Sequence, residues 1–184
     1  MSLIYTKKGD KGKSFINGKY ILKSSLIFKI LGQTDEFICY IGFLKHLVKN
    51  KNLKNVLEEI QEEIFILQAK LASIFLLKKN PKNLPDLKDA LKNWEEFIDN
   101  LNLKVPQKFI IPATNKESAI CHLLRAKIRI IEENLVDLIK NKKEKEEFLS
   151  YINRLSSLFY ALSLKLSNKK EKFPSYKIKK VKWN

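Results

Sequence analysis

Arginine, glycine, proline and cysteine are all scarce in this chain of 184 residues. Five glycines and five prolines leave little material for the many turns of a large sheet, which favours long helices. The longest apolar stretch, 64–77, is interrupted by Gln68 and Lys70 and is too short to cross a bilayer. The first residues show neither an apolar signal core nor an arginine-rich leader. These absences predict a soluble, cytoplasmic protein.

Two cysteines are present, Cys39 and Cys121, and both have apolar neighbours in a helical pattern. Neither belongs to a CxxC pair or to a Cys/His spacing typical of a metal site. We therefore expect two reduced core residues rather than a disulfide or metal ligands.

The formal net charge is +16, from 36 Lys and Arg against 20 Asp and Glu. Such an excess suits nucleic-acid binding, because basic side chains displace counterions from phosphates. However, the lysines are spread over the whole chain, and only Arg125, Arg129 and Arg154 are arginines. A general lysine bias explains most of the charge without any partner. The three guanidinium groups are more informative, because they suit planar, bidentate binding of phosphate or carboxylate.

All the glycines lie in the first quarter of the chain, and Gly9, Gly12 and Gly18 punctuate a Lys-rich segment. This composition predicts a loop, not a helix or a regular strand. Its backbone N–H groups, with Lys7 and the Ser14 hydroxyl, are suited to an anion-binding nest. A solvated surface turn is the alternative explanation of the same residues.

From Thr34 onward apolar residues recur at helical spacing. The pattern predicts five helices, at about residues 34–48, 53–77, 86–102, 115–140 and 145–166. Thr114 and Glu117 have the spacing of a capping box, which places the start of the fourth helix near Asn115. Short connectors favour one bundle. We expect a single all-α domain over 1–184, divided into an N-terminal segment (1–32), a five-helix bundle (33–167) and a basic C-terminal tail (168–184).

On the fourth predicted helix, His122, Arg125, Arg129 and Glu132 follow one another at steps of 3, 4 and 3. This spacing places the four side chains on one helix face. Most of their neighbours are apolar, and a polar stripe on such a helix is costly unless its members pair or line a cleft. A ligand-binding cleft and an ion-pair network that fixes helix register both explain the pattern.

Six short motifs follow one another along the chain. They are Tyr5-Thr6-Lys7-Lys8-Gly9-Asp10-Lys11-Gly12, Gly32-x-x-Asp35-Glu36, Ile60-Gln61 with Leu71-Ala72, Phe109-Ile110-Ile111-Pro112, His122-x-x-Arg125-x-x-x-Arg129-x-x-Glu132 and Tyr151-x-Asn153-Arg154-Leu155-Ser156. In this order and with these gaps, they resemble the motifs of PduO-type ATP:cob(I)alamin adenosyltransferases. Lys23 also falls where that family keeps a lysine. The resemblance covers residues 4–166.

The resemblance implies an all-α five-helix bundle with an N-terminal Gly/Lys loop. It implies that the chain transfers the 5′-deoxyadenosyl group of ATP to cob(I)alamin, giving adenosylcobalamin and triphosphate. Asp35 and Arg125 would form a salt bridge that orders the site. Phe109 would lie against the lower face of the corrin, displace the axial ligand and make Co(II) easier to reduce. The implied ATP-binding residues are Thr6, Lys7, Lys8, Gly9, Ser14, Lys23, Arg129, Glu132 and Asn153.

The resemblance also implies partners. ATP would be the co-substrate, cobalamin the substrate, and Mg²⁺ would share the charge of the phosphates. The expected assembly is a homotrimer with sites between subunits, and a flavin-type reductase is a candidate partner. Neither a membrane nor a nucleic acid is expected.

Three departures from the family motifs leave alternatives open. Lys8 replaces a threonine, residues 113–115 replace Gly-Gly-Ser, and the run 129–133 has lost two arginines. One alternative is a diverged, non-catalytic paralogue that binds ATP or corrin. The other is a basic, helical nucleic-acid-binding protein, suggested by the net charge and the Lys-rich tail 168–184. The latter predicts steeply salt-dependent binding.

Overall fold

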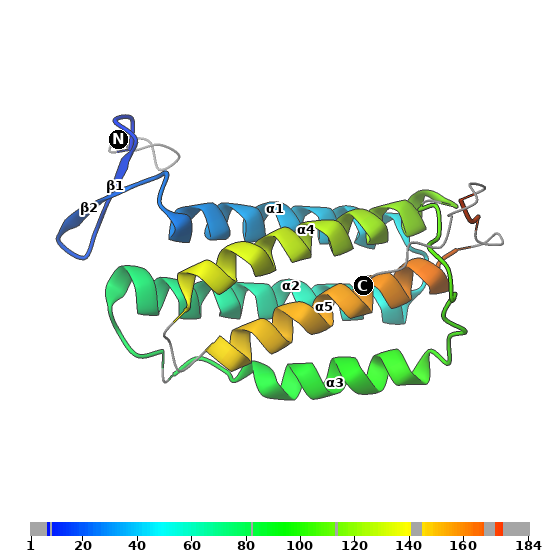
Figure 1. Cartoon of the computed structure of the whole chain (residues 1–184). Coiled ribbons are helices and arrows are strands. Elements are labelled where there is room, and N and C mark those ends of the chain that lie inside the picture. Colours follow the sequence, from blue (N-terminus) through cyan, green and yellow to red (C-terminus); the bar gives the residue numbers. More distant parts are fainter. Residues whose placement is uncertain are drawn as a thin grey trace, which may run out of the picture.

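The structure is a computed structural model that describes residues 7, 9–81, 83–112, 114–140, 145–167 and 172–174. Five long helices pack side by side, and a small β-hairpin projects beyond one end of the bundle (Figure 1). The elements are β1 (Lys13–Ile16), β2 (Lys19–Leu22), α1 (Leu26–Leu47), α2 (Lys51–Ala72), α3 (Leu87–Asn100), α4 (Lys116–Leu138) and α5 (Lys145–Lys165), with a π-helical turn (Ser73–Leu77) continuing α2. The predicted all-α, five-helix fold is confirmed.

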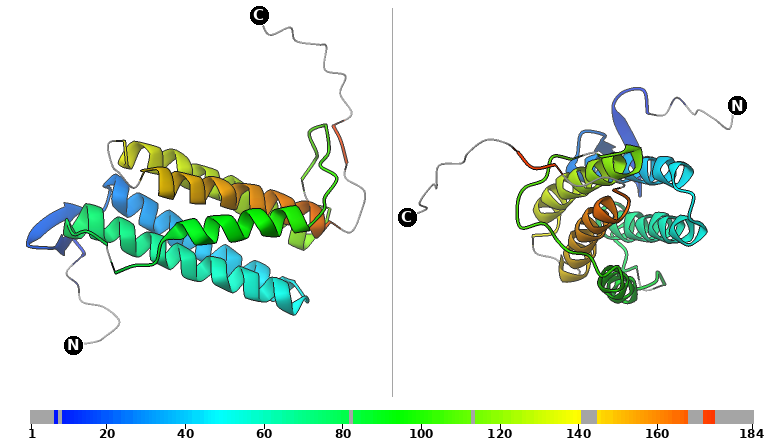
Figure 2. Two further views of the ribbon diagram at one scale, coloured as in Figure 1. Left: turned by 90° about the horizontal axis from the view of Figure 1, so that it is seen from below. Right: turned by 90° about the vertical axis from the view of Figure 1, so that its right-hand side faces the viewer.

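The core lies between α1, α2, α4 and α5, and α3 packs against α5 at the side of the bundle (Figure 2). Each of the four central helices contributes fully buried apolar side chains at helical spacing. The rings of Phe37 on α1 and Phe159 on α5 meet edge to face, with their centroids 5.5 Å apart. No helix among the described residues is long and apolar enough to span a membrane.

Helix α1 begins at Leu26, well before the predicted start at Thr34. The reason is that Ile27 and Ile30 already belong to the buried stripe that continues through Thr34 and Phe37. The helix therefore begins inside the segment 1–32 that the sequence assigned to nucleotide binding.

The prediction of a loop is wrong at Lys13 and Ser14, which belong to β1. Residues 13–16 pair with residues 19–22 in an antiparallel hairpin. Asn17 and Gly18 occupy its two-residue turn with φ angles of 50° and 75°. Two positive φ angles are the mark of a type I′ turn, for which Asn-Gly is the favoured sequence. The Asn17 side chain donates from Nδ2 to the carbonyl oxygen of Leu77 across 3.1 Å, so the hairpin tip is tied to the end of the π-helical turn.

The start of α4 near Asn115 is confirmed, but its predicted capping box is wrong. Asn115 is the N-cap, and its Oδ1 accepts a hydrogen bond from the Ser118 backbone N–H at 2.8 Å. Thr114 lies outside the helix, with its hydroxyl 2.7 Å from that of Ser167 at the end of α5. The Thr114 hydroxyl therefore pairs with a residue distant in sequence and does not cap the helix.

Both cysteines are free thiols, but only one lies in the core. Cys121 is buried, and burial raises the pKa of its thiol to about 12. Cys39 is exposed, which corrects the expectation of a core residue. It sits midway between the buried Phe37 and Ile41, a position that the helical repeat turns toward the opposite side of α1.

A half-buried carboxylate joins three of the helices. Glu63 on α2 accepts hydrogen bonds at Oε2 from Trp94 Nε1 on α3, at 2.8 Å, and from the Tyr151 hydroxyl on α5, at 2.7 Å. Burial raises the pKa of Glu63 above its ordinary value. Tyr151 is fully buried, and burial raises its pKa as well. The carboxylate therefore links α2, α3 and α5 through hydrogen bonds.

Candidate functional site

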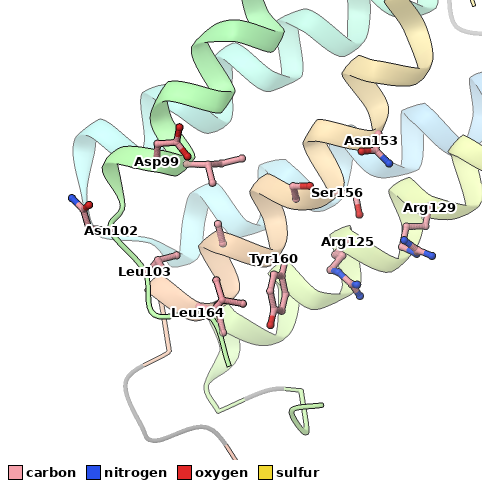
Figure 3. Close-up of a pocket in the computed structure, with 13 residues that line it drawn as sticks. Asp99, Asn102, Leu103, Arg125, Arg129, Asn153, Ser156, Tyr160 and Leu164 are labelled. Carbon is pink, nitrogen blue, oxygen red and sulfur yellow. The ribbon is translucent and has the colours of Figure 1, made fainter. Parts of the chain in front are cut away.

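A cavity of about 750 Å³ opens between the C-terminal end of α3 and the facing sides of α4 and α5 (Figure 3). Its polar lining comes from Arg125 and Arg129 on α4, Asn153 on α5 and Asp99 near the end of α3. We call it the arginine pocket. Two of the three arginines of the chain therefore line one cavity.

Helix periodicity explains why these side chains meet. Arg125 and Arg129 are one turn apart on the face of α4 that looks toward α5, while Leu124 and Ile128 face the core. The two helices run antiparallel, so that Glu132 lies level with Asn153. Asn153 donates from Nδ2 to Glu132 Oε1 across 3.1 Å.

A second cavity, of about 550 Å³, adjoins the first. Residues of the loop 106–112 form one side of it, and His122, Arg125 and Tyr160 form the other. We call it the loop pocket. Phe109 lines this pocket, with 81% of its surface exposed. An aromatic side chain exposed in the lining of a cavity is available to contact a large apolar ligand.

Arg125 and Tyr160 line both pockets. The Arg125 guanidinium carbon lies 5.4 Å from the centroid of the Tyr160 ring. This distance is that of a cation–π contact.

Asp35 lines neither of the two pockets. It is exposed on α1 and accepts a hydrogen bond at 2.6 Å from Gln68 Nε2 on α2. The expected salt bridge between Asp35 and Arg125 is not among the ion pairs that the described residues of one chain form. The two side chains turn to different neighbours, Asp35 to α2 and Arg125 to α5.

The predicted phosphate-binding residues of the N-terminal segment gather at the base of the hairpin. Gly9 lies directly against the side chain of Lys23, because a Cβ atom on Gly9 would be 2.6 Å from Lys23 Nζ. The Lys23 backbone N–H donates to the carbonyl oxygen of Gly12 at 2.9 Å, and Ser14 lies in β1. Lys7 has a positive φ angle of 57°. Thr6 and Lys8 lie outside the described residues.

Within a single chain, the N-terminal segment that contains the hairpin lies apart from the arginine pocket. The hairpin projects from the end of the bundle where α1 begins, whereas the pocket lies between α3, α4 and α5 (Figure 1). The predicted nucleotide-binding residues thus form two separate groups, at the hairpin and at the arginine pocket.

Several lining residues were not among the predicted site residues. Asp99 and Asn102 come from α3 and the turn after it, and Ser156, Ser157 and Tyr160 come from α5. The available signal on α5 was the helical spacing of Ser157 and Tyr160 from Asn153. No sequence signal pointed to Asp99 on α3, because only packing determines which side of that helix faces α5.

Residues 4–166 match the sequence model of the cobalamin adenosyltransferase family. The chain belongs to this family. Among its curated relatives, the corrinoid adenosyltransferase of Bos taurus is 31% identical over 169 residues, which cover 87% of this chain and 69% of that protein. The corrinoid adenosyltransferase of Bacillus subtilis is 31% identical over 164 residues, covering 86% and 83%. That of Citrobacter freundii is 30% identical over 171 residues, covering 89% and 94%.

Solved structures of the same family share the fold. A phenylalanine-to-alanine variant of the PduO-type ATP:corrinoid adenosyltransferase from Lactobacillus reuteri, complexed with cobalamin and ATP, matches with a TM-score of 0.83 and 27% identity. The match covers 94% of this chain and 99% of that one. An arginine-to-lysine variant of the same enzyme, complexed with ATP, matches with a TM-score of 0.79, covering 92% and 99%.

Proposed function

We propose that this member of the family transfers the 5′-deoxyadenosyl group of ATP to cob(I)alamin, giving adenosylcobalamin and triphosphate. The observation that carries the proposal is the convergence of Arg125, Arg129 and Asn153 on one pocket. That pocket adjoins a second one in which Phe109 is exposed. The family membership supplies the reaction, and the pockets supply a place for a phosphate-bearing ligand beside a large apolar one.

The reaction requires stabilisation of a growing negative charge. The electron pair of Co(I) forms a bond to the 5′ carbon of ATP, and the bond from that carbon to the phosphate oxygen breaks. Triphosphate leaves with the electron pair of the broken bond. The planar guanidinium of Arg129 is suited to bind two phosphate oxygens at once, and its charge stabilises the leaving group in the transition state.

Lys7, Gly9, Ser14 and Lys23 would hold the triphosphate from the opposite side, together with Thr6 and Lys8. The close approach of Gly9 to Lys23 supports this arrangement, because it leaves the Lys23 ammonium beside exposed backbone. Phe109 would lie against the lower face of the corrin and occupy the place of an axial ligand. Its high exposure supports a role as a contact surface for a bound ligand.

Mg²⁺ fits this site as an ion that ATP brings with it. Among the described residues, no group of three or more His, Cys, Asp or Glu could hold a metal. Mg²⁺ commonly binds through one or two carboxylates, phosphate oxygens and water, so a large protein cage is not required. Glu132, which accepts a hydrogen bond from the lining residue Asn153, is the carboxylate that would contact it, while Asp99 lines the pocket on the side of α3. When bound, Mg²⁺ would neutralise part of the phosphate charge.

We further propose a homotrimer whose sites lie between subunits. The separation of the hairpin from the arginine pocket supports it, as does the separation of Asp35 from Arg125. A ring of identical subunits joins two different surfaces of the chain at every interface. In such a ring, the hairpin and Asp35 of one subunit would meet Arg125 and Arg129 of the next.

Mixing two impaired variants tests this shared site. Asp35→Asn impairs one surface of the subunit and Arg129→Lys the other. After they are denatured together and refolded at equal concentrations, about a quarter of the interfaces in a ring carry both intact surfaces. Activity above that of either variant alone supports the shared site, and activity that never exceeds the two parents contradicts it. Sedimentation must show a trimer in the same samples.

The reaction itself is tested with Mg²⁺-ATP and chemically reduced cobalamin, by following the absorbance of adenosylcobalamin. Binding of both ligands without product would indicate the non-catalytic paralogue. Tight, salt-dependent binding of nucleic acid without product would favour the nucleic-acid alternative. Chemical reduction makes the assay independent of a reductase, so the flavin-type partner stays a separate prediction. A reaction that consumes ATP and a strongly reduced corrinoid is expected in the cytoplasm.

A further inference from the structure

The wall between the arginine pocket and the loop pocket consists of two side chains. Arg125 of α4 and Tyr160 of α5 are the described residues that line both cavities. Tyr160 is half-buried, and Figure 3 shows its ring beside Arg125 between the two helices. The position of the Arg125 guanidinium therefore affects the shape and charge of both pockets at once.

The contact of this arginine with Tyr160 is set by the register of the two helices. Arg125 precedes Glu132 on α4 by about two turns, and Tyr160 follows Asn153 on α5 by the same amount. Because the helices are antiparallel, the hydrogen bond between Asn153 and Glu132 fixes the level at which Arg125 and Tyr160 meet. The imidazole of His122 approaches the same ring, with centroids 6.5 Å apart.

The ring of Tyr160 also contacts the charge of Arg125. No carboxylate forms an ion pair with Arg125 among the described residues. A long side chain without an anchor would sample many rotamers, and ordering them costs free energy. A planar guanidinium stacks on an aromatic face better than an ammonium does, which explains an arginine at this position in a lysine-rich chain.

We propose that Tyr160 is a positioning residue, whose ring holds the Arg125 guanidinium in the wall between the two pockets. Its phenolic hydroxyl is not needed for this role, because the face of the ring makes the contact. For its effect on turnover, the inference rests on the proposed adenosyl transfer. The orientation of Arg125 itself can be measured without any turnover.

The arginine content of the chain makes that measurement direct. With three arginines, the ¹⁵N spectrum of the Nε–Hε groups contains three signals. The signal of Arg125 is identified by its loss in Arg125→Gln. We expect it to be displaced by the ring current of Tyr160, to stay displaced in Tyr160→Phe, and to move to the ordinary position in Tyr160→Leu. Tyr160→Met serves instead if the leucine variant does not fold.

Tyr40 on α1 provides a matched control. The centroid of its ring lies 5.0 Å from Nζ of Lys127 on α4. Tyr40→Leu removes a comparable ring–cation contact away from both pockets, and it should leave the Arg125 signal in place. An undisplaced Arg125 signal in the unaltered protein would overturn the proposal. So would a displacement that survives in Tyr160→Leu.

A double-mutant cycle then measures the effect on catalysis. Tyr160→Leu should lower kcat/KM roughly 2- to 30-fold, the range expected for loss of a cation–π contact. In an Arg125→Gln background it should cost little more, and Tyr160→Phe should be close to unaltered protein. A full loss in the Arg125→Gln background would mean that Tyr160 acts directly on a ligand, which overturns the positioning role. If the unaltered protein forms no adenosylcobalamin, the proposed function fails, and the Nε–Hε spectra alone decide this inference.

Discussion

Asn153 on α5 donates a hydrogen bond from Nδ2 to Oε1 of Glu132 on α4, with the two atoms 3.1 Å apart. Arg129 lies one turn before Glu132 on the same helix and lines the same cavity as Asn153. The amide therefore orients a carboxylate beside the proposed phosphate site without adding negative charge to it.

Asn153→Asp should weaken the use of ATP more than Asn153→Ala does. The aspartate replaces a donor with a second carboxylate next to Glu132, and the added negative charge opposes the binding of phosphates. At a partly exposed site we expect roughly a tenfold increase in KM for ATP relative to the alanine variant. Steady-state kinetics with ATP varied at saturating cob(I)alamin measures it. Equal KM values for the two variants would place the phosphates away from Asn153.

Gly9→Ala should weaken ATP binding through Lys23. The new Cβ atom would lie 2.6 Å from Lys23 Nζ, and the flexible end of the lysine side chain can move away at little cost in stability. We expect KM for ATP to rise several-fold, with a melting temperature close to that of unaltered protein. In a Lys23→Met background, Gly9→Ala should have almost no further effect. If it remains equally harmful there, the backbone of Gly9 itself is the ligand.

Ionisation of Glu63 should lower the free energy of unfolding as the pH rises. Its pKa is raised in the folded state, so the folded chain holds this proton more tightly than the unfolded chain does. The resulting stabilisation is complete below the ordinary pKa of 4.5 and is lost as the pH rises through the higher folded-state pKa. Glu63→Gln keeps an oxygen acceptor for Trp94 and Tyr151 but cannot ionise.

The free energy of unfolding, measured by urea denaturation, should therefore fall less with rising pH in Glu63→Gln than in unaltered protein. Glu96→Gln, at an exposed position on α3, is the control and should follow the unaltered curve. Parallel curves for Glu63→Gln and unaltered protein would show that Glu63 titrates normally. Glu63→Ala should be destabilising at every pH, by about 1–3 kcal/mol for each buried donor left without an acceptor.

Lys70 and Glu147 form a buried ion pair between α2 and α5, with side-chain exposures of 7% and 15%. Glu147 also accepts from the backbone N–H of Leu87 at 3.2 Å, which joins the start of α3 to the same point. Lys70→Met should destabilise the fold by about 3–5 kcal/mol, because it leaves the carboxylate buried without its cation. The double variant Lys70→Met/Glu147→Leu should lose less than the sum of the two single losses. Additive losses, measured by urea denaturation, would mean that the pair is not coupled.

The helices could be predicted because the sequence pattern that defines them is also the pattern of burial. Ile60, Ile64, Leu67 and Leu71 show it on α2, where all four are fully buried. The hairpin was missed although its signal was present. Asn17-Gly18 stands between Phe15-Ile16 and Tyr20-Ile21, but the nearby lysines and glycines suggested a loop.

Spacing alone could place site residues together only where they share a helix. Arg125, Arg129 and Glu132 could be placed on one face of α4 from their spacing alone. By contrast, nothing in the sequence separates Asp35 from Arg125, because the contacts of Asp35 with α2 and of Arg125 with α5 follow from packing. Tyr160 was not predicted as a site residue, because its contact with Arg125 also follows from packing.

Arg129 should be needed for its planar guanidinium group and not only for its charge. It is exposed on α4 and lines the arginine pocket, in a chain that otherwise uses lysine for nearly all its basic residues. Arg129→Lys keeps the charge but loses the planar group that binds two oxygens together. We expect the fold and melting temperature to be kept. We also expect a loss of roughly 1.5–3 kcal/mol in transition-state binding, or about ten- to more than a hundredfold in kcat/KM for ATP.

The affinity for cobalamin should change much less in this variant, since a phosphate ligand and not a corrin ligand has been altered. A variant with a lower melting temperature but normal kinetics would show instead that Arg129 only fixes the register of α4. Arg154→Lys is the matched control. Its guanidinium binds Glu95 on α3 at 2.7 Å, so it should affect stability by less than about 1 kcal/mol, as partly exposed ion pairs do, and leave KM for ATP unchanged.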